Sequence, residues 1–202
     1  MGTPYKILVA PDEKAALWAM PNFGPDLYDE LKTIPLVEEP PITIRGRECR
    51  QRRDVGFYSD DSIGYRYSGQ FAKAFSFDQA PFLKDLMVSV NNTLGTEFNG
   101  VLVNRYQNGE KYLSAHSDSK LGLDKKNFMV AGIAYGPGIR KFRIREKGTG
   151  EKTNPIVIDH YHKPRELLVM EGEFQERYTH EIPIEKTVKE ERISVTFRRH
   201  LI

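Results

Sequence analysis

Two histidines and one aspartate in this chain have the types and spacing of ligands to a redox-active metal ion. His116 and Asp118 are separated by a single residue, and His180 follows far downstream. Alternate residues of a strand point to the same side, so a His-x-Asp pair can direct both side chains at one point. Two imidazoles and one carboxylate on one face of a ferrous ion leave positions open for a chelating cosubstrate and O2. The pattern therefore predicts a non-haem iron site.

The His-x-Asp pair is a weak signal on its own, because the chain has five histidines and many aspartates. A rival pair of ligands lies in His160-Tyr161-His162. We interpret those two as surface histidines or as strand histidines that have hydrogen-bond partners.

Two arginines near the C-terminal end of the chain could bind an anion. Arg192 and Arg198 are six residues apart in an apolar segment, and therefore lie on the same face of an extended strand. An arginine that faces into a sheet is costly unless an anion meets it. A dicarboxylate such as 2-oxoglutarate supplies one, because its carboxylates match the guanidinium fork. The alternative is a pair of structural salt bridges to Glu190 or Glu191, which the spacing alone favours.

Basic residues are clustered although the net charge is only +2. The two clusters are Arg45, Arg47, Arg50, Arg52 and Arg53, and Arg140, Lys141, Arg143, Arg145 and Lys147. Such clusters can neutralise the phosphates of a nucleic acid. They can also be charged strand edges that prevent aggregation.

The bulk composition is that of one globular domain. The chain has 202 residues, of which 39% are hydrophobic and 29% charged, and no apolar run approaches the ~20 residues that cross a bilayer. The segment after Met1 lacks the apolar core of a signal peptide. The single cysteine, Cys49, excludes an internal disulfide. We expect no membrane association and an intracellular, reducing compartment, nucleus or cytoplasm.

The elements that must position these residues are mainly strands. Helices are expected from about Pro25 to Lys32 and after Asp78, the second ending at Gly95. The expected strands are 100–106, 129–135, 141–145, 155–161, 166–170 and 192–198. Residues 141–145 alternate between apolar and basic, which predicts one buried face and one cationic face. Short strands with helices in the first half predict an antiparallel double sheet of jelly-roll type, supported by N-terminal helices.

Several of these motifs together resemble the AlkB family of 2-oxoglutarate dioxygenases, most of all its animal and bacterial DNA-repair members. The order and separation match for Asn104-x-Tyr106, His116-x-Asp118, His180, Arg192 and Arg198. The flanking segments also match: Val103 to Tyr106, Ala115 to Asp118, Tyr178 to Pro183, and Arg192 to Arg198. The pair Ile133 to Gly136 and Arg140 to Arg145 is similar to the family's Ser-Phe-Gly and Arg-x-Phe segments. The resemblance runs from about Arg50 to Arg198.

The resemblance implies a role for each site residue. The Fe(II) ligands would be His116, Asp118 and His180, and the residues binding 2-oxoglutarate would be Asn104, Tyr106, Arg192, Ser194 and Arg198. Arg192 would pair with the distal carboxylate, supported by Tyr106, while Asn104 and Arg198 hold the end that chelates iron. Repair members commonly have Asn where Ser194 stands, which leaves that contact open. With O2 as second cosubstrate, decarboxylation to succinate would drive hydroxylation of an N-alkyl carbon, which leaves as an aldehyde.

The segment from Gly64 to Gly69 resembles the family's aromatic-x-aromatic-Ser-Gly segment in a nucleotide-recognition lid. Tyr67 would stack on the damaged base, opposite His116, and Tyr65 would form a hydrogen bond nearby. A methylated base is cationic and a flipped base has lost its stacking, so both favour an aromatic face. The alternative is two core tyrosines in a strand. Arg50 and Arg52 precede the lid, where phosphates would lie, and Asp54 replaces a Gln that is frequent in repair members.

We therefore predict an α+β, mainly β domain over residues 1–202, a double-stranded β-helix (jelly roll) with supporting helices. About 1–98 would form the N-terminal extension and lid, and about 99–202 the catalytic core. The predicted function is oxidative dealkylation of bases such as 1-methyladenine and 3-methylcytosine in DNA or RNA, and nothing requires more than a monomer. One alternative keeps the chemistry but acts on a protein, lipid or small molecule, and another is a non-catalytic binding module on the same fold.

Overall fold

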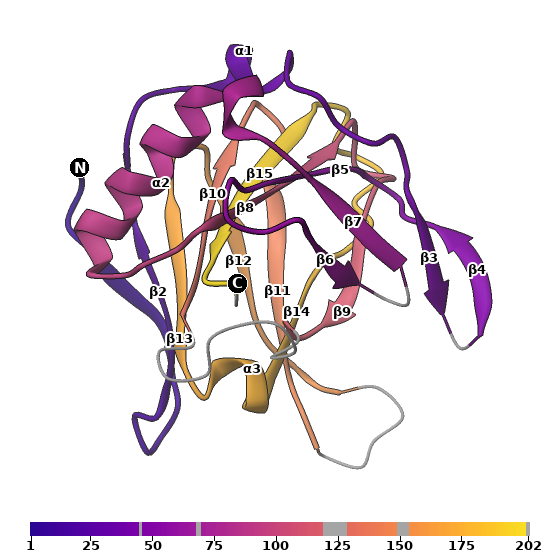
Figure 1. The fold of residues 1–202 in the computed structure, drawn as a ribbon. Coiled ribbons are helices and arrows are strands. Elements are labelled where there is room, and N and C mark those ends of the chain that lie inside the picture. Colours follow the sequence, from indigo (N-terminus) through magenta and orange to yellow (C-terminus); the bar gives the residue numbers. More distant parts are fainter. Residues whose placement is uncertain (45, 68–69, 119–128, 149–153, 201–202) are drawn as a thin grey trace.

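A computed structural model of the chain describes residues 1–44, 46–67, 70–118, 129–148 and 154–200, without the side chains of 65–67. Within these residues the strands form a large sheet, a smaller sheet and a separate hairpin (Figure 1). The order in the large sheet is β1 (Tyr5–Val9), β2 (Ala15–Met20), β13 (Leu167–Gly172), β10 (Val130–Tyr135), β15 (Arg192–Arg198), β8 (Gly100–Tyr106), β5 (Asp54–Tyr58), β7 (Gln70–Phe75) and β6 (Gly64–Tyr67). The order in the smaller sheet is β12 (Ile156–His162), β11 (Arg140–Glu146), β14 (Tyr178–Ile182) and β9 (Leu113–His116). The hairpin consists of β3 (Pro41–Ile44) and β4 (Arg47–Arg50), and stands out from the body.

Helices are few and short in the described residues. They are α1 (Tyr28–Leu31), the 3-10 turn η1 (Phe77–Gln79), α2 (Pro81–Leu94) and α3 (Phe174–Arg177). The longest, α2, begins with Pro81, whose fixed φ suits the first helical position, and ends at Gly95 with φ +65°. It lies across one face of the large sheet (Figure 1). None of the helices in the described ranges is long and apolar enough to span a bilayer.

The mainly β jelly-roll prediction is confirmed, and most of the predicted strands agree with the structure to within two residues. The strands at 100–106 and 192–198 have the predicted bounds. The first predicted helix is shorter than expected: α1 covers only Tyr28–Leu31 and has no side-chain hydrogen bond at its N-cap. Strands β1 and β2 were not predicted, although they complete one edge of the large sheet. The division into an N-terminal part and a catalytic core stays a prediction.

The alternation of side chains along β15 separates the core from the interior space between the sheets. Ile193, Val195 and Phe197 are fully buried and pack toward α2, together with residues of β8 and β10. The alternate residues Arg192, Ser194 and Arg198 therefore point to the opposite face, toward the smaller sheet. A second apolar cluster, which includes Leu17, Val130, Ile144, Met170 and Phe174, fills part of the space between the sheets.

The packing of α2 on the large sheet gives a test of this core. Leu83 is fully buried, whereas Val88 of the same helix is 47% exposed. We expect Leu83→Ala to lower the free energy of unfolding by about 2–5 kcal/mol, since it removes buried methyl groups and leaves a cavity. The matched control Val88→Ala should change it by less than about 0.5 kcal/mol. Denaturant unfolding of both variants measures the difference, and equal effects would contradict this packing.

Candidate metal and cosubstrate site

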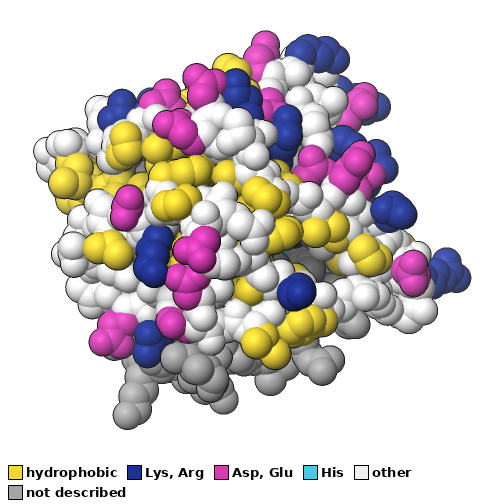
Figure 2. Space-filling view, turned by 45° about the horizontal axis from the view of Figure 1, so that its top comes forward, with side chains coloured by type: hydrophobic (Ala, Val, Ile, Leu, Met, Phe, Trp, Pro, Cys, Tyr) yellow, Lys and Arg dark blue, Asp and Glu magenta, His cyan; other side chains and the backbone are white. Residues whose placement is uncertain are grey.

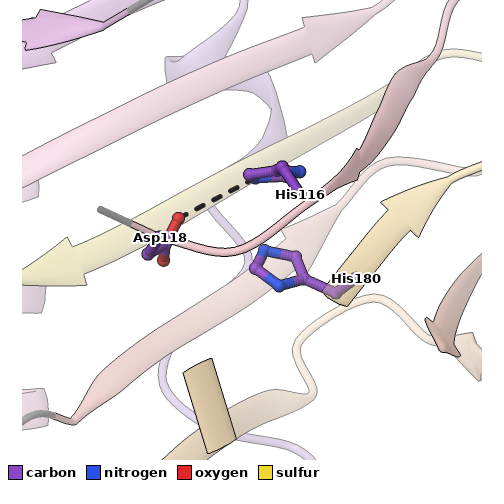
Figure 3. Close-up of side chains that lie close together, drawn as sticks. All are labelled: His116, Asp118 and His180. Carbon is purple, nitrogen blue, oxygen red and sulfur yellow. Dashed lines mark ion pairs between the residues drawn. The ribbon is translucent and has the colours of Figure 1, made fainter. Parts of the chain in front are cut away.

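The pairing of β9 with β14 brings the two predicted histidine ligands together. His116 and His180 are cross-strand partners, and their ring centroids are 4.3 Å apart. Asp118 follows two residues after the end of β9, and its Oδ1 lies 3.8 Å from His116 Nε2. The possible ligand atoms of the three residues all lie within 4.8 Å of one another (Figure 3). The predicted convergence of His116, Asp118 and His180 is therefore present.

Local hydrogen bonds hold the segment from Ser114 to Asp118 in place. His116 Nδ1 lies 2.9 Å from the carbonyl of Ser114, so Nδ1 carries the proton and Nε2 is left as the coordinating nitrogen. The Ser117 hydroxyl donates to the carbonyl of Tyr178 at 2.7 Å. The backbone N–H of Asp118 donates to Oε1 of the buried Gln175 at 2.9 Å. These bonds tie the ligand segment to β14 and α3.

The protonation states of the three side chains suit a metal ion. Burial, with the neighbouring His116 as the next cause, lowers the pKa of His180 to about 3. Burial likewise lowers the pKa of His116 below its usual range. Burial raises the pKa of Asp118, but Arg198 and the two histidines outweigh it, so the net pKa of Asp118 lies below its usual value. At neutral pH the group is thus two neutral imidazoles and one carboxylate, the forms that bind metals.

Two buried atoms of this group have no hydrogen-bond partner within the described part of the chain: Asp118 Oδ2 and His180 Nδ1. Buried polar atoms normally find a partner, so these two atoms are available to a water, an ion or a ligand. A ferrous ion fits, because two imidazoles and one carboxylate are the ligand set of non-haem iron oxygenases.

Arg192 is the second half of the site. Its side chain is only 2% exposed, and its guanidinium carbon lies 5.5 Å from the ring centroid of Tyr106, its cross-strand partner on β8. Nη2 donates to His162 Nδ1 at 3.1 Å, whereas Nε and Nη1 have no partner among the described residues. Burial lowers its pKa to about 10, so the group remains charged at neutral pH. An anion is needed to satisfy these donors.

A comparison with Arg140 shows what a structural buried arginine looks like in this protein. Arg140 is 1% exposed and donates to Glu185 Oε2, to the carbonyls of Asn108 and Lys111, and to that of Pro183. Unlike Arg192, it is held by a carboxylate and by several carbonyl groups. The difference between the two indicates that the free donors of Arg192 serve a ligand.

In the described part of the chain neither C-terminal arginine pairs with Glu190 or Glu191, the partners of the salt-bridge alternative, although Arg198 forms an ion pair with another residue. Glu191 accepts a hydrogen bond from Arg105 at 2.6 Å and from Tyr28 at 3.2 Å. Arg198 pairs with the predicted metal ligand Asp118, its Nη2 lying 2.8 Å from Oδ1. A carboxylate that keeps one oxygen on an arginine and has the other free can still bind a cation.

The other predicted cosubstrate residues lie on the same inter-sheet face. Asn104 and Ser194 are both buried and are cross-strand partners on β8 and β15. Phe142 of β11 contacts both halves of the site, since its ring centroid lies 5.3 Å from that of His180 and 6.3 Å from that of His162. The arrangement brings the predicted metal and anion sites into one space, while the contacts of Asn104, Tyr106, Ser194 and Arg198 with a cosubstrate stay predictions.

Arg53, a member of the first basic cluster, contacts a predicted cosubstrate residue. It is 4% exposed, and its Nε donates to Oδ1 of Asn104 at 2.7 Å. Burial is the main cause of the lowered pKa of His116, and the charge of Arg53 lowers that pKa by a smaller amount. The sequence carries no signal for this contact, because residues 51–53 lie between β4 and β5 and the run Gln-Arg-Arg has no apolar alternation that marks Arg53 as buried.

The rival histidines and the second basic cluster have structural partners. His160 Nε2 lies 2.7 Å from Glu166 Oε2, and His162 Nε2 lies 2.8 Å from the carbonyl of Glu166, which confirms the interpretation of both as satisfied strand histidines. Acidic side chains neutralise the predicted cationic face of β11, which favours the charged strand edge over phosphate binding for this cluster. Arg143 forms a two-bond ion pair with Asp159, and Arg145 pairs with Glu181 at 2.9 Å. On the face of the molecule drawn in Figure 2, basic and acidic side chains are interspersed.

The predicted lid is only partly described. Residues Gly64–Tyr67 form the edge strand β6, but the side chains of Tyr65 and Tyr67 and residues 68–69 lie outside the described residues. Their roles stay predictions, as do those of the exposed Arg50 and Arg52; Arg45 is also outside the described residues. Asp54 is buried and accepts hydrogen bonds from the backbone of Glu39 and the side chain of Gln107. Its carboxylate therefore holds neighbouring segments together.

Comparison with known proteins defines the class. Residues 28–198 match the sequence model of the 2OG-Fe(II) oxygenase superfamily, and the chain belongs to that superfamily, whose members use Fe(II) and 2-oxoglutarate. Within it, the similarity is to AlkB-type proteins. The chain is 28% identical over 187 residues to DNA oxidative demethylase ALKBH2 of Arabidopsis thaliana, which covers 79% of this chain and 56% of that protein. It is 30% identical over 126 residues to human alpha-ketoglutarate-dependent dioxygenase alkB homolog 3, covering 58% and 42%.

The solved structure of OsALKBH1 has the same fold, with a TM-score of 0.55 and 14% identity over 91% of this chain and 97% of that one. The chain spans less than two thirds of the length of the two curated relatives.

Metal binding gives a direct test of the three-residue group. We expect the protein to bind one Fe(II) or Mn(II) ion per chain. His180→Ala should lower the affinity for the metal by more than about 100-fold, because removing a ligand costs more than removing a residue that only hydrogen-bonds to a ligand. The control His160→Ala removes a histidine bonded to Glu166 outside the group and should leave the stoichiometry unchanged. Titration with metal, with thermal unfolding to verify folding, distinguishes them. Equal losses in both variants would contradict the assignment.

Proposed function

We propose that this chain catalyses oxidative dealkylation of N-alkylated bases, such as 1-methyladenine and 3-methylcytosine, in DNA or RNA. The reaction couples decarboxylation of 2-oxoglutarate to succinate with release of the alkyl group as an aldehyde. The observation that carries the proposal is the buried Arg192 guanidinium, two of whose nitrogens have no partner among the described residues, in the same inter-sheet space as the His116, Asp118 and His180 group. Nucleic acid as substrate is supported by the similarity to a protein named DNA oxidative demethylase.

The residues of the chain would divide the work between holding the cofactors and orienting them. Bound Fe(II) and 2-oxoglutarate together supply the activation of O2 and the oxidation of an unreactive C–H bond. His116, Asp118 and His180 hold the metal, and Arg192 binds the distal carboxylate with Tyr106 beside it. Asn104, Ser194 and Arg198 line the end of the cosubstrate next to the metal. Burial of this space excludes water, which strengthens each charged contact.

The substrate surface would consist of the lid and the exposed arginines before it. Arg50 and Arg52 are exposed, and Arg52 precedes the buried Arg53 that contacts Asn104. Phosphates bound by these two side chains would bring a base close to the metal site. Tyr67 would then stack on the base and Tyr65 would donate a hydrogen bond, since a cationic base is attracted to an aromatic face.

Product analysis tests the reaction. The metal-loaded protein with 2-oxoglutarate should demethylate an oligonucleotide that carries 1-methyladenine or 3-methylcytosine and release formaldehyde. Arg192→Ala should lower kcat/KM for 2-oxoglutarate by about 100-fold, the loss expected from charge-assisted hydrogen bonds of roughly 3 kcal/mol. Arg143→Ala, an arginine ion-paired on the outer face of β11, is the matched control and should leave that value unchanged.

The outcomes separate the three hypotheses. Decarboxylation without loss of the methyl group from any DNA or RNA would contradict a nucleic-acid substrate and favour a protein, lipid or small molecule. Absence of 2-oxoglutarate decarboxylation in the metal-loaded protein would favour the non-catalytic module.

Salt dependence tests the phosphate contacts. The double charge reversal Arg50→Glu and Arg52→Glu should weaken binding of a single-stranded oligonucleotide. It should also flatten the slope of log affinity against log salt by about 1.4, since each of the two lost phosphate contacts removes roughly 0.7. The matched control reverses Lys6 and Lys14, which are exposed on and beside β1, at the opposite edge of the large sheet from β6. Identical slopes in the two double variants would exclude a specific role for Arg50 and Arg52.

A further inference from the structure

His162 is the single hydrogen-bond acceptor that the described residues offer to the Arg192 side chain. Its Nδ1 lies 3.1 Å from Arg192 Nη2, and both residues are almost completely buried. His162 is the last residue of β12 in the smaller sheet, and Arg192 is the first residue of β15 in the large sheet. Their hydrogen bond therefore crosses the space between the two sheets. The ring is also held edge-on by Phe142, at 6.3 Å between centroids and an interplanar angle of 75°.

The tautomer of His162 is fixed by its second hydrogen bond. Nε2 lies 2.8 Å from the carbonyl of Glu166, which can only accept, so Nε2 carries the proton. Nδ1 is then a lone-pair acceptor and matches the N–H of Arg192, which can only donate. Burial, with the charge of Arg192 as the next cause, lowers the pKa of His162 to about 3, so the ring stays neutral.

A further layer of bonds holds the turn that presents this carbonyl. The Glu166 carboxylate is buried and accepts from the Tyr5 hydroxyl at 2.6 Å, from His160 Nε2 at 2.7 Å and from the backbone N–H of Lys163 at 3.2 Å. The N–H of Glu166 donates to the carbonyl of Lys163. Strand β1 and the end of β12 thus determine where the Glu166 carbonyl points, and through it the His162 ring.

We propose that His162 is a positioning residue for Arg192: it takes one N–H of the guanidinium and so orients the remaining donors toward the distal carboxylate of the cosubstrate. A neutral imidazole does this without cancelling the charge. A carboxylate in the same place would form an ion pair with Arg192 and compete with the incoming dicarboxylate. His162 does not itself contact the cosubstrate in this proposal, which rests on the proposed binding of 2-oxoglutarate.

The experiment compares three substitutions that differ in where they place an acceptor. His162→Leu removes it, His162→Asn keeps an oxygen at the position of Nδ1, and His162→Gln places one near the position of Nε2. Affinities for 2-oxoglutarate and for pyruvate, which has the same chelating end but no distal carboxylate, are measured without O2 on the Mn(II)-loaded protein. Thermal unfolding and metal titration verify that each variant is folded and loaded.

His162→Leu should weaken 2-oxoglutarate binding by about tenfold, as the loss of one hydrogen bond to a charged group predicts, and should leave pyruvate binding unchanged. His162→Asn should stay within about threefold of the natural chain, and His162→Gln should resemble His162→Leu. In turnover, His162→Leu should raise KM for 2-oxoglutarate at an unchanged kcat. If His162→Leu does not fold, the comparison of Asn with Gln carries the same test.

Equal loss of both ligands in His162→Leu would mean a general structural role and would overturn the proposal. So would unchanged 2-oxoglutarate binding in His162→Leu, or equal affinities in the Asn and Gln variants. Failure of the unsubstituted, metal-loaded chain to bind 2-oxoglutarate would instead refute the proposed function, so the two failures are distinguishable.

Discussion

A buried positive charge that meets no carboxylate among the described residues is the constraint on which the site depends. Arg192 is enclosed between two sheets, its one described acceptor is a neutral imidazole, and two of its nitrogens have no described partner. The desolvation of a guanidinium costs several kcal/mol, and an anion is the group that offsets it. The same space contains a carboxylate and two neutral histidines whose spare atoms require a cation. The two unmet requirements are complementary, because one small dicarboxylate that chelates the metal can satisfy both.

The fold produces this arrangement by strand alternation. On β15 the residues Ile193, Val195 and Phe197 enter the core under α2, so Arg192 and Arg198 must face the smaller sheet. The apolar packing that stabilises the large sheet thus also fixes the direction of the charged side chains. Cross-strand pairing does the same for the metal group, since it places His180 directly opposite His116. Site and core are therefore two faces of the same strands.

Much of this could be predicted from the sequence where a periodic pattern was present. The apolar alternation of residues 192–198 and 100–106 and the 3–4 residue spacing of α2 gave the right elements. Strand β2 could not be recognised because it pairs with β13, about 150 residues away, and β1 joins the sheet by pairing with β2. The shortness of α1 and the neutralisation of β11 by Asp159 and Glu181 are likewise tertiary effects.

The metal ligands were found because their motif is local or resembles a family motif, whereas Arg53 and His162 act through another residue and carry no motif. Arg53 is tied to Asn104, and His162 to Arg192, by bonds that only the folded chain brings together. The most direct measurement of the central claim is a crystal structure of the protein grown without O2 in the presence of Mn(II) and 2-oxoglutarate. We expect the metal on His116, Asp118 and His180, chelated by one end of the cosubstrate, with the other carboxylate hydrogen-bonded to Arg192. A cosubstrate bound elsewhere, or an Arg192 covered by a protein carboxylate, would contradict this expectation.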